Sequence, residues 1–290
     1  MANFIQLLIG GVSMGILYGV VAIGFVLLWQ TSQTINFGQG ELVMVPMFIM
    51  VALHLVLKIP FWPSFILTLV ASGIMGYLFE RLMIRKLLPG GVLVIVIATL
   101  GLSGFLRYGM QIAWTPQTLF FPPLFSTEPI RLGNITFSPE DIWNIVLISI
   151  IIIVLHLCIK RTKLGMAMQA VAQSRETAEL MGINVRHIII LVFVLNSVLA
   201  GTAAVFAAPI FFVRYDIGIF LGVKAFVAAI IGGFNQIRGA LVGGLTVGLA
   251  ETFAAAYITT AYRDAFVMIL LLIVLLIKPE GIMGIKEEAY

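Results

Sequence analysis

The sequence predicts an all-α protein, a polytopic bundle of transmembrane helices. Hydrophobic residues make up 61% of the 290 positions and charged residues only 10%, which is far from the composition of a soluble domain. The mean hydropathy is +1.13, and the apolar runs are continuous and about twenty residues long, the length that a helix needs to cross a bilayer. A transmembrane barrel would show shorter segments of alternating hydrophobicity instead. We therefore expect one transmembrane domain over residues 1–290, with about eight to ten spans.

The first five predicted spans precede the most polar part of the chain. They cover residues 4–29, 42–57, 64–82, 92–114 and 142–159. In the first span, Gly11, Gly15 and Gly19 recur every fourth residue and predict a face that packs closely on another helix. Residues 30–42 are polar but contain no Lys or Arg. Residues 115–141 contain five prolines, which predict an ordered external loop with short strands or helices.

The later spans are less regular. Residues 187–212 form the sixth, and residues 265–277 close the bundle. Between them, residues 219–234 and 240–258 are short and rich in glycine. They form either two full spans or a broken pair of shorter helices, of the kind that transporters place near the membrane midplane. Counted as separate crossings, the segments give nine spans.

Residues 160–186 are the longest polar, charge-bearing interval in the chain. The stretch 164–181 has no proline and a single glycine, which predicts one helix with a small, mildly apolar face. Arg175 and Glu179 are i,i+4 neighbours at the more polar end of the helix, and Gly182 is expected to end it in a left-handed turn. Such a helix between two spans favours docking into a groove on another protein. The alternative is an amphipathic helix on the lipid surface, held by its basic flanks.

The basic residues predict the orientation of the chain in the membrane. With the 160–186 loop in the cytoplasm, eleven of the 17 Lys and Arg residues lie on the cytoplasmic side and four on the outer side, while Arg107 and Lys224 lie inside spans. We therefore expect a multi-pass protein of a bacterial-type plasma membrane. The N-terminus would be outside and, if the spans number nine, the C-terminus would be cytoplasmic.

Five charged residues fall within or at the edges of predicted spans: Glu41, Arg107, Lys224, Glu251 and Asp264. Charges at this depth are costly, so each is a candidate for function. For Arg107, Glu251 and Asp264 we favour a buried ion pair or an interfacial side chain. Glu41 and Lys224 lie beside glycine-broken helix ends, where polar groups and freed backbone can line a solute path.

The sequence carries no motif of catalytic or metal chemistry. It has no P-loop GxxxxGK[ST] and no nucleophile elbow GxSxG. His54, His156 and His187 are isolated, and the single cysteine, Cys158, excludes an intrachain disulfide. The net charge of +4 includes no basic block with interleaved aromatic residues, so we expect membrane lipid and not nucleic acid as a partner. We therefore expect no enzyme, no metal and no cofactor on this chain; if ATP is used, separate subunits bind it.

The end of the polar loop resembles a known coupling motif. Glu176-Thr177-Ala178, followed by three residues and Gly182, is similar to the EAA-x3-G signature in the cytoplasmic loop of ABC importer permeases, with Thr177 in place of the second-position alanine. In that family the helix before the glycine sits in a cleft of an ATPase subunit. The resemblance therefore implies an ATPase-coupling role for residues Arg175, Glu176, Ala178, Glu179 and Gly182.

Four further stretches resemble the branched-chain amino acid permeases among these importers. Residues 15–42 are similar to the family's opening and match its Asn-Phe-Ala-His-Gly-Glu-Leu run except at Gly38 and Gln39. The other three stretches follow in the family's order, and they are residues 77–103, 225–251 and 263–284. Together with the charges inside the spans, the resemblance implies a translocation path that includes Asn36, Gly40, Glu41, Lys224 and Glu251.

The resemblance implies the transmembrane permease subunit of an ABC-type importer. Such a subunit forms the path for amino acids, here branched-chain or hydrophobic ones. It works with a second, related permease (as a heterodimer), two cytoplasmic ATPase subunits and a periplasmic or extracellular solute-binding protein. Because Gly38 and Gln39 depart from the family's run, a permease of the same family for urea, amides or aromatic acids is an alternative. A different alternative is an ion-coupled secondary transporter of a small polar solute, using Glu41, Lys224 or Glu251.

Overall fold

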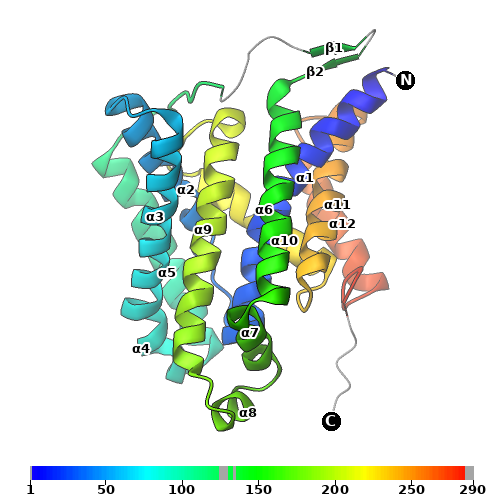
Figure 1. Ribbon diagram of the computed structural model, residues 1–290. Helices are drawn as coiled ribbons and strands as arrows, with labels where there is room; N and C mark the ends of the chain where they lie inside the picture. The colour runs from blue at the N-terminus through cyan, green and yellow to red at the C-terminus, as the bar shows by residue number, and fades with distance from the viewer. Residues whose placement is uncertain (1, 124–129, 133–134, 285–290) are drawn as a thin grey trace. The chain divides into compact units, whose positions relative to one another are not determined.

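The computed structural model describes residues 2–123, 130–132 and 135–284 (Figure 1). Its α-helices are α1 (Ala2–Ser32), α2 (Glu41–Val51), α3 (Phe61–Phe79), α4 (Arg85–Leu87), α5 (Val92–Ala113), α6 (Pro139–Arg161), α7 (Lys163–Gln173), α8 (Arg175–Leu180), α9 (Val185–Phe211), α10 (Ile217–Gly232), α11 (Ile237–Tyr257) and α12 (Arg263–Ile277). π-Helical turns over Ala52–Val56 and Glu80–Ile84 follow α2 and α3, and a 3-10 turn covers Leu88–Gly90. A short antiparallel hairpin pairs β1 (Ile130–Leu132) with β2 (Ile135–Phe137).

The predicted bundle of transmembrane helices is confirmed. Within the described residues, six helical segments are long and apolar enough to cross a membrane: Phe4–Ser32, Phe61–Gly90, Val92–Ala113, Pro139–Arg161, Val185–Phe211 and Ile237–Tyr257. Two shorter apolar helices, Glu41–Val56 and Ile217–Gly232, occupy the second and seventh predicted spans. Helix α12 occupies the last predicted span. Each predicted span thus corresponds to a helix, while the number of crossings stays a prediction.

The chain divides into two compact units by its internal contacts. Unit 1 comprises Met1–Val26, Pro122–Ile151 and Val223–Tyr290, and unit 2 comprises Leu27–Phe121 and Ile152–Gly222. Helices α1, α6 and α10 contribute residues to both units. The expectation of a single transmembrane domain stays a prediction.

In unit 1, α1 packs on α11 through the predicted glycine stripe. A Cβ added at Gly15 would lie 2.7 Å from the Cα of Leu245 and 2.9 Å from the carbonyl oxygen of Gly244. Gly11 and Gly19, one turn away on either side, face the same helix. Because no side chain fits into this space, the two helix backbones approach each other directly. The predicted contact face of the first span is therefore confirmed.

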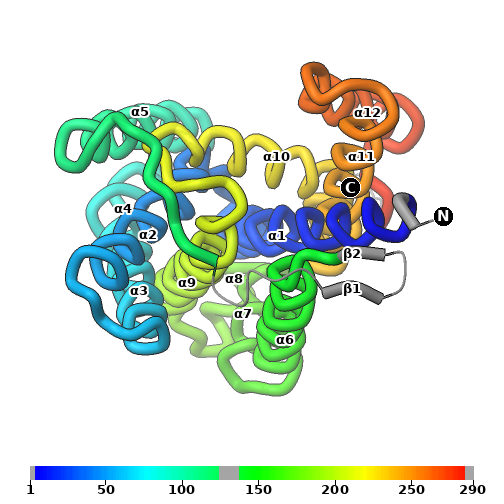
Figure 2. Tube along the Cα trace, turned by 90° about the horizontal axis from the view of Figure 1, so that it is seen from above, coloured from blue at the N-terminus to red at the C-terminus, as the bar shows by residue number. Residues whose placement is uncertain are grey.

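In unit 2, α3 and α9 lie side by side (Figure 2) and are also joined through small residues. Buried positions on α3 recur every fourth residue and are Ser64, Thr68, Ser72 and Gly76. A Cβ at Gly201 of α9 would lie 2.8 Å from the Cβ of Ser72. The hydroxyl groups of Thr68 and Ser72 donate to carbonyl oxygens one turn earlier in α3, at 2.8 and 2.7 Å. These hydroxyls are satisfied within their own helix, so this face of α3 can pack against an apolar neighbour.

The 160–186 loop forms two helices, α7 and α8, so the prediction of one helix over 164–181 is wrong. The backbone is extended at Ser174, with φ −159° and ψ 116°. The Ser174 hydroxyl oxygen accepts a hydrogen bond from the amide of Thr177 at 3.2 Å. Serine competes with the helix for backbone hydrogen bonds and favours the N-cap position, so here it ends one helix and begins the next. Helix propensity averaged over the stretch does not include this local competition.

The left-handed turn predicted at Gly182 is confirmed by its φ of +81°. The Gly182 amide donates to the carbonyl of Glu179 at 2.9 Å, and the Ile183 amide donates to that of Ala178 at 3.0 Å. This pair of bonds is the Schellman motif that commonly ends helices. A Cβ at Gly182 would meet no atom within 4 Å, so the backbone angle and not a lack of space favours glycine.

The proline-rich interval 115–141 contains the two short strands β1 and β2, as expected. Residues 124–129 and 133–134 of this interval lie outside the described residues. In unit 2, Leu119 and Val213 form an isolated antiparallel bridge with N–O distances of 2.9 and 3.0 Å. This bridge fastens the start of the interval to the segment that follows α9.

Candidate functional site

Charged side chains from three helices meet inside unit 1. The ammonium of Lys224, on α10, lies 2.6 Å from Oε1 of Glu251, on α11, and 2.9 Å from Oδ1 of Asp264, in the first turn of α12. The Tyr18 hydroxyl of α1 donates to the other oxygen of Glu251 at 2.9 Å. Arg263 approaches Oε1 of Glu251 to 3.6 Å. These five residues are the unit 1 charge cluster, in which the side chains of Lys224 and Glu251 are only 7% and 8% exposed.

Small residues bring α10 and α11 close enough for this pairing. A Cβ at Gly243 of α11 would collide with the carbonyl of Ala228, one turn after Lys224 on α10. Two basic and two acidic side chains leave the cluster without net charge. Each buried charge has a partner at a depth where an unpaired charge would cost several kcal/mol. The cluster therefore connects α10, α11 and α12 through paired charges.

Glu41 and Arg107 form a second buried ion pair, in unit 2. The Nη2 atom of Arg107, on α5, lies 3.0 Å from Oε1 of Glu41 and 3.0 Å from the hydroxyl of Ser103. Glu41 is the first residue of α2, where the helix dipole favours a carboxylate. The Nε atom of Arg107 is buried without a hydrogen-bond partner. The buried ion pair favoured for Arg107 and Glu251 is confirmed, with Glu41 and Lys224 as the partners, while Asp264 pairs with Lys224 from a half-exposed position.

A polar turn over residues 33–40 connects α1 to α2 and is mostly buried in unit 2, with Gln33 and Phe37 exposed. Gln39 and Asn196, on α9, exchange two hydrogen bonds between their side-chain amides, at 2.7 and 2.9 Å. The side-chain oxygen of Asn36 accepts from the Gly38 amide at 2.9 Å, while its Nδ2 atom has no partner. Asn196 was missed in the sequence, although a lone amide within an apolar span signals a hydrogen-bond partner. Gln39 is therefore held by an amide from another helix.

Gly40 marks a close approach between the start of α2 and the first turns of α10, within unit 2. A Cβ at Gly40 would collide with the carbonyl of Gly218, and one at Gly222 would lie 3.0 Å from the Cα of Gly40. The five residues predicted for the translocation path thus form two groups. Asn36, Gly40 and Glu41 lie in unit 2, and Lys224 and Glu251 lie in unit 1. Their role in solute passage stays a prediction.

The five residues predicted for ATPase coupling lie on and around α8, with different surroundings. Glu176, Glu179 and Gly182 are exposed. Ala178 is 2% exposed and is buried within its own chain. Its small side chain therefore lets α8 pack against the rest of the permease. Arg175 is partly buried and also faces its own chain.

Two apolar side chains at the end of α8 were missed in the sequence. Leu180 is 89% exposed and Met181 is 76% exposed, and both lie beside the exposed Glu179. Exposed apolar side chains next to charges are typical of protein contact surfaces. The signal was present, because two consecutive large apolar residues end an otherwise polar stretch.

Arg175 bonds to the backbone of α1. Its Nε atom donates to the carbonyl oxygen of Thr31 at 3.1 Å, and its Nη2 atom is buried without a partner. Burial lowers the pKa of the guanidinium from its usual value, which lies so far above neutral that the group stays charged. Arg175 and Glu179 are i,i+4 neighbours on α8, but among the described ion pairs there is none between them. The guanidinium of Arg175 bonds instead to a partly buried backbone carbonyl of α1, a helix that is distant in the sequence.

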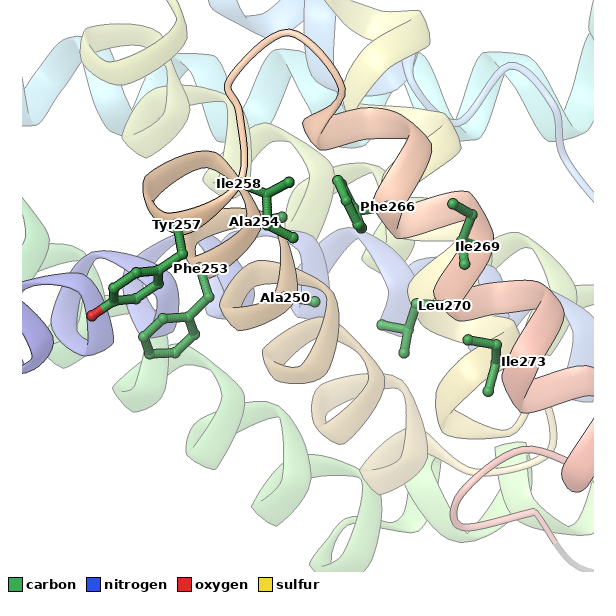
Figure 3. Close-up of a pocket in the computed structure, with 9 residues that line it drawn as sticks. All are labelled: Ala250, Phe253, Ala254, Tyr257, Ile258, Phe266, Ile269, Leu270 and Ile273. Carbon is green, nitrogen blue, oxygen red and sulfur yellow. The ribbon is translucent and has the colours of Figure 1, made fainter.

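An apolar groove of about 360 Å³ lies between α11 and α12 in unit 1 (Figure 3). It is lined by Ala250, Phe253, Ala254, Tyr257, Ile258, Phe266, Ile269, Leu270 and Ile273. The hydroxyl of Tyr257 points away from the other side chains (Figure 3). The groove offers no charged or polar side chain that would recognise a polar solute, so we do not assign the path to it.

Comparison with known proteins adds independent evidence. A family described as the permease component of branched-chain amino acid transport systems matches residues 7–275. The permease protein BraD of a high-affinity branched-chain amino acid transport system in Pseudomonas aeruginosa is 32% identical over 98% of this chain and 97% of its own. The corresponding permease protein LivH of Escherichia coli is 30% identical over 98% of this chain and 96% of its own.

A solved structure supports the fold. The chain resembles PsaBC from Streptococcus pneumoniae, determined in complex with Fab, with a TM-score of 0.53 over 95% of this chain and 91% of that one. Their sequence identity of 16% limits this likeness to the fold. The family match, in contrast, extends from α1 to α12 and includes both buried ion pairs and the α7–α8 loop. The chain belongs to the family of permease components of branched-chain amino acid transport systems.

Proposed function

We propose that this protein is the transmembrane permease subunit of an ABC-type importer and forms the path for branched-chain or other hydrophobic amino acids. The observation that carries the proposal is the family match over residues 7–275. The α7–α8 loop supports it, because it presents Glu176, Glu179, Leu180 and Met181 to solvent and ends in the turn at Gly182. Such a projecting surface suits a partner that pushes on the membrane helices.

The partners belong to the same proposal. They are two cytoplasmic ATPase subunits, a second related permease and an external solute-binding protein. Because the sequence has no P-loop, ATP is bound by the partner subunits and the permease is not catalytic. The exposed surface of α8 is the proposed contact with one ATPase.

The buried charges favour this function over an ion-coupled secondary transporter. A nearby cation disfavours protonation of a carboxylate and competes with Na⁺ for it, so a paired carboxylate is a weaker coupling site than an unpaired one. Glu41 is paired with Arg107, and Glu251 is paired with Lys224. Both groups are internally neutral, which suits a path for a zwitterion of zero net charge. We propose that Asn36, Gly40, Glu41, Lys224 and Glu251 border this path.

Reconstitution tests the function. We expect the permease, purified with its ATPases in proteoliposomes and supplied with its solute-binding protein, to take up leucine only when hydrolysable ATP is present on the ATPase side. Urea, an amide and an aromatic amino acid, offered separately, test the related solutes. Uptake driven by a Na⁺ or H⁺ gradient without ATP would contradict the proposal.

The proposed orientation places the N-terminus outside, the α7–α8 loop in the cytoplasm and the C-terminus in the cytoplasm after nine spans. Cysteine at Gln173, an exposed residue at the end of α7, should resist an impermeant thiol reagent in intact cells and react in inverted vesicles. Native Cys158, which is exposed, is replaced first. Cysteine at the exposed Gln117 is the control and should react from outside. Labelling of position 173 in intact cells would reverse the topology.

A further inference from the structure

The C-terminal end of α1 carries backbone carbonyls that no further helical turn can satisfy. The amide of Gln33 donates to the carbonyl of Trp29 at 2.9 Å and thereby closes the last helical bond. The carbonyl of Thr31 lies beyond it and accepts from Nε of Arg175 at 3.1 Å. A cation at this position also complements the negative end of the helix dipole. Arg175 therefore serves as the cap of a helix from which it is separated by 144 positions in the sequence.

Arg175 is the first residue of α8, a short helix whose opposite side is exposed. Helix α8 covers only Arg175–Leu180 and starts after the break at Ser174. Glu176 and Glu179 are exposed on it, while Arg175 reaches α1. A helix of this length moves as one piece, so a force on its exposed side displaces Arg175 with it.

The chain that follows Thr31 enters the buried polar turn at once. Gln33 leaves the helix with a φ of +49°, and Gln39, which is fully buried, exchanges two hydrogen bonds with Asn196. Glu41, at the end of the turn, is paired with Arg107. A shift of the Thr31 carbonyl is therefore transmitted over a few residues to the polar groups that we propose border the path.

The Nη2 atom of Arg175 suggests that the contact between Arg175 and the end of α1 has two conformations. The Nη2 atom of Arg175 is buried without a hydrogen-bond partner in the described conformation. A buried donor without a partner disfavours the state in which it occurs. A conformation that brings an acceptor within reach of this nitrogen would gain a bond. Arg175 is thus suited to hold α1 in one arrangement and to favour a second.

We propose that Arg175 is a positioning residue that transmits movement of α8 to the C-terminal end of α1 and, through it, to the polar turn 33–40. The inference rests on the proposed function, because it assumes an ATPase that docks on the exposed side of α8. It assigns Arg175 to transmission within the permease, whereas Glu176 and Glu179 remain on the docking side.

The test separates docking from transmission. Arg175→Met, which removes every donor, is compared with Arg175→Lys, which keeps a cation able to reach the carbonyl. Arg186→Met is the matched control, because Arg186 is an exposed arginine of the same loop. Cysteine at the exposed Gln33, in a protein without Cys158, carries a fluorescent label that reports on the end of α1. ATPase capture, ATP hydrolysis, leucine uptake and the ATP-induced change in fluorescence are measured for the full complex.

We expect Arg175→Met to capture and activate the ATPases as the wild type does, while uptake per ATP falls at least tenfold and the label at position 33 no longer responds to ATP. Arg175→Lys should restore part of both, and Arg186→Met should change neither. Wild-type uptake and fluorescence response in Arg175→Met would overturn the inference, and so would loss of ATPase capture, which would make Arg175 a docking residue. These two outcomes leave the proposed function intact. Absence of ATP-dependent uptake by the wild-type complex would instead overturn the function, and the inference with it.

Discussion

Replacing Lys224 by methionine is expected to destabilise the protein by about 3–5 kcal/mol and to impair solute uptake. The change removes the ammonium that lies 2.6 Å from Glu251 and 2.9 Å from Asp264, and the two carboxylates keep only the more distant and half-exposed Arg263, at 3.6 and 3.9 Å, as a cation. Glu251 determines most of the cost, because it is 8% exposed while Asp264 is 51% exposed and remains hydrated. The measurements are thermal unfolding of the purified protein in detergent and ATP-driven uptake by the complex.

Three further variants make the result specific. Lys224→Arg keeps the positive charge and should recover part of the stability. Combining Lys224→Met with Glu251→Gln should cost less than the sum of the single changes, because no buried charge is then left next to an apolar side chain. Asp216→Asn removes a half-exposed ion pair to Arg214 and should cost about 1 kcal/mol or less. An unchanged unfolding temperature in Lys224→Met would show that the buried pair contributes nothing to stability.

The same experiment in unit 2 tests the path residues. Glu41→Gln leaves Arg107 with a hydrogen-bond acceptor but without a counter-charge, in a site where Glu41 is 2% exposed. Uptake should fall in this variant as well. If Lys224→Met and Glu41→Gln both transport at the wild-type rate, both residues are structural and do not border the path.

Changing Gly182 to valine is expected to abolish ATP-driven uptake while the protein still inserts and folds. With φ at +81°, a β-branched residue is strained by about 1–2 kcal/mol, and relief of this strain redirects the chain between α8 and α9. A Cβ here would meet no atom within 4 Å, so the effect comes from the backbone alone. Gly182→Asn is the matched control, because asparagine tolerates this conformation. It should retain most of the uptake.

Reversing the charge at Glu176 tests the docking side of the same helix. Glu176→Lys should weaken ATPase capture and abolish uptake, because loss of a charged contact at an interface costs about 2–5 kcal/mol. If α8 instead lies on lipid, the added positive charge strengthens its attachment and uptake stays intact. Gln173→Lys, at an exposed position before the helix break, adds charge outside α8 and should have little effect. Normal ATP-dependent uptake by both Gly182→Val and Glu176→Lys would remove the assignment of α8 as the coupling helix.

The positions of the membrane helices could be predicted from the sequence to within a few residues. The fourth predicted span, 92–114, is α5 (Val92–Ala113), and the sixth, 187–212, is α9 (Val185–Phe211). The length of an apolar run can be counted directly along the sequence. In a bilayer such a run must form the hydrogen bonds of its backbone within itself, and it does so by forming a helix. The left-handed turn at Gly182 could also be predicted, because a residue with positive φ commonly ends a helix and glycine adopts this conformation without a steric clash.

The candidate site could be predicted in its residues but not in its contacts. The five charges inside the spans were visible, but only the packing of α2 with α5 and of α10 with α11 and α12 decides that Glu41 meets Arg107 and that Lys224 meets Glu251. The break at Ser174 was missed, because one side-chain hydrogen bond outweighed the helix propensity of the residues around it.

The sequence by itself therefore determined the membrane class, the order of the helices, the polar loop and the residues that carry charge into the bundle. The tertiary structure alone decided that Gln39 pairs with Asn196 and that Arg175 caps α1 at Thr31, partners that lie 157 and 144 positions apart. The physical reason is that span length and turn conformation depend on neighbouring residues, whereas the partner of a polar side chain depends on which helix faces pack together. Packing is settled by the small residues and volumes of all the helices at once, and no single stretch of the sequence encodes it.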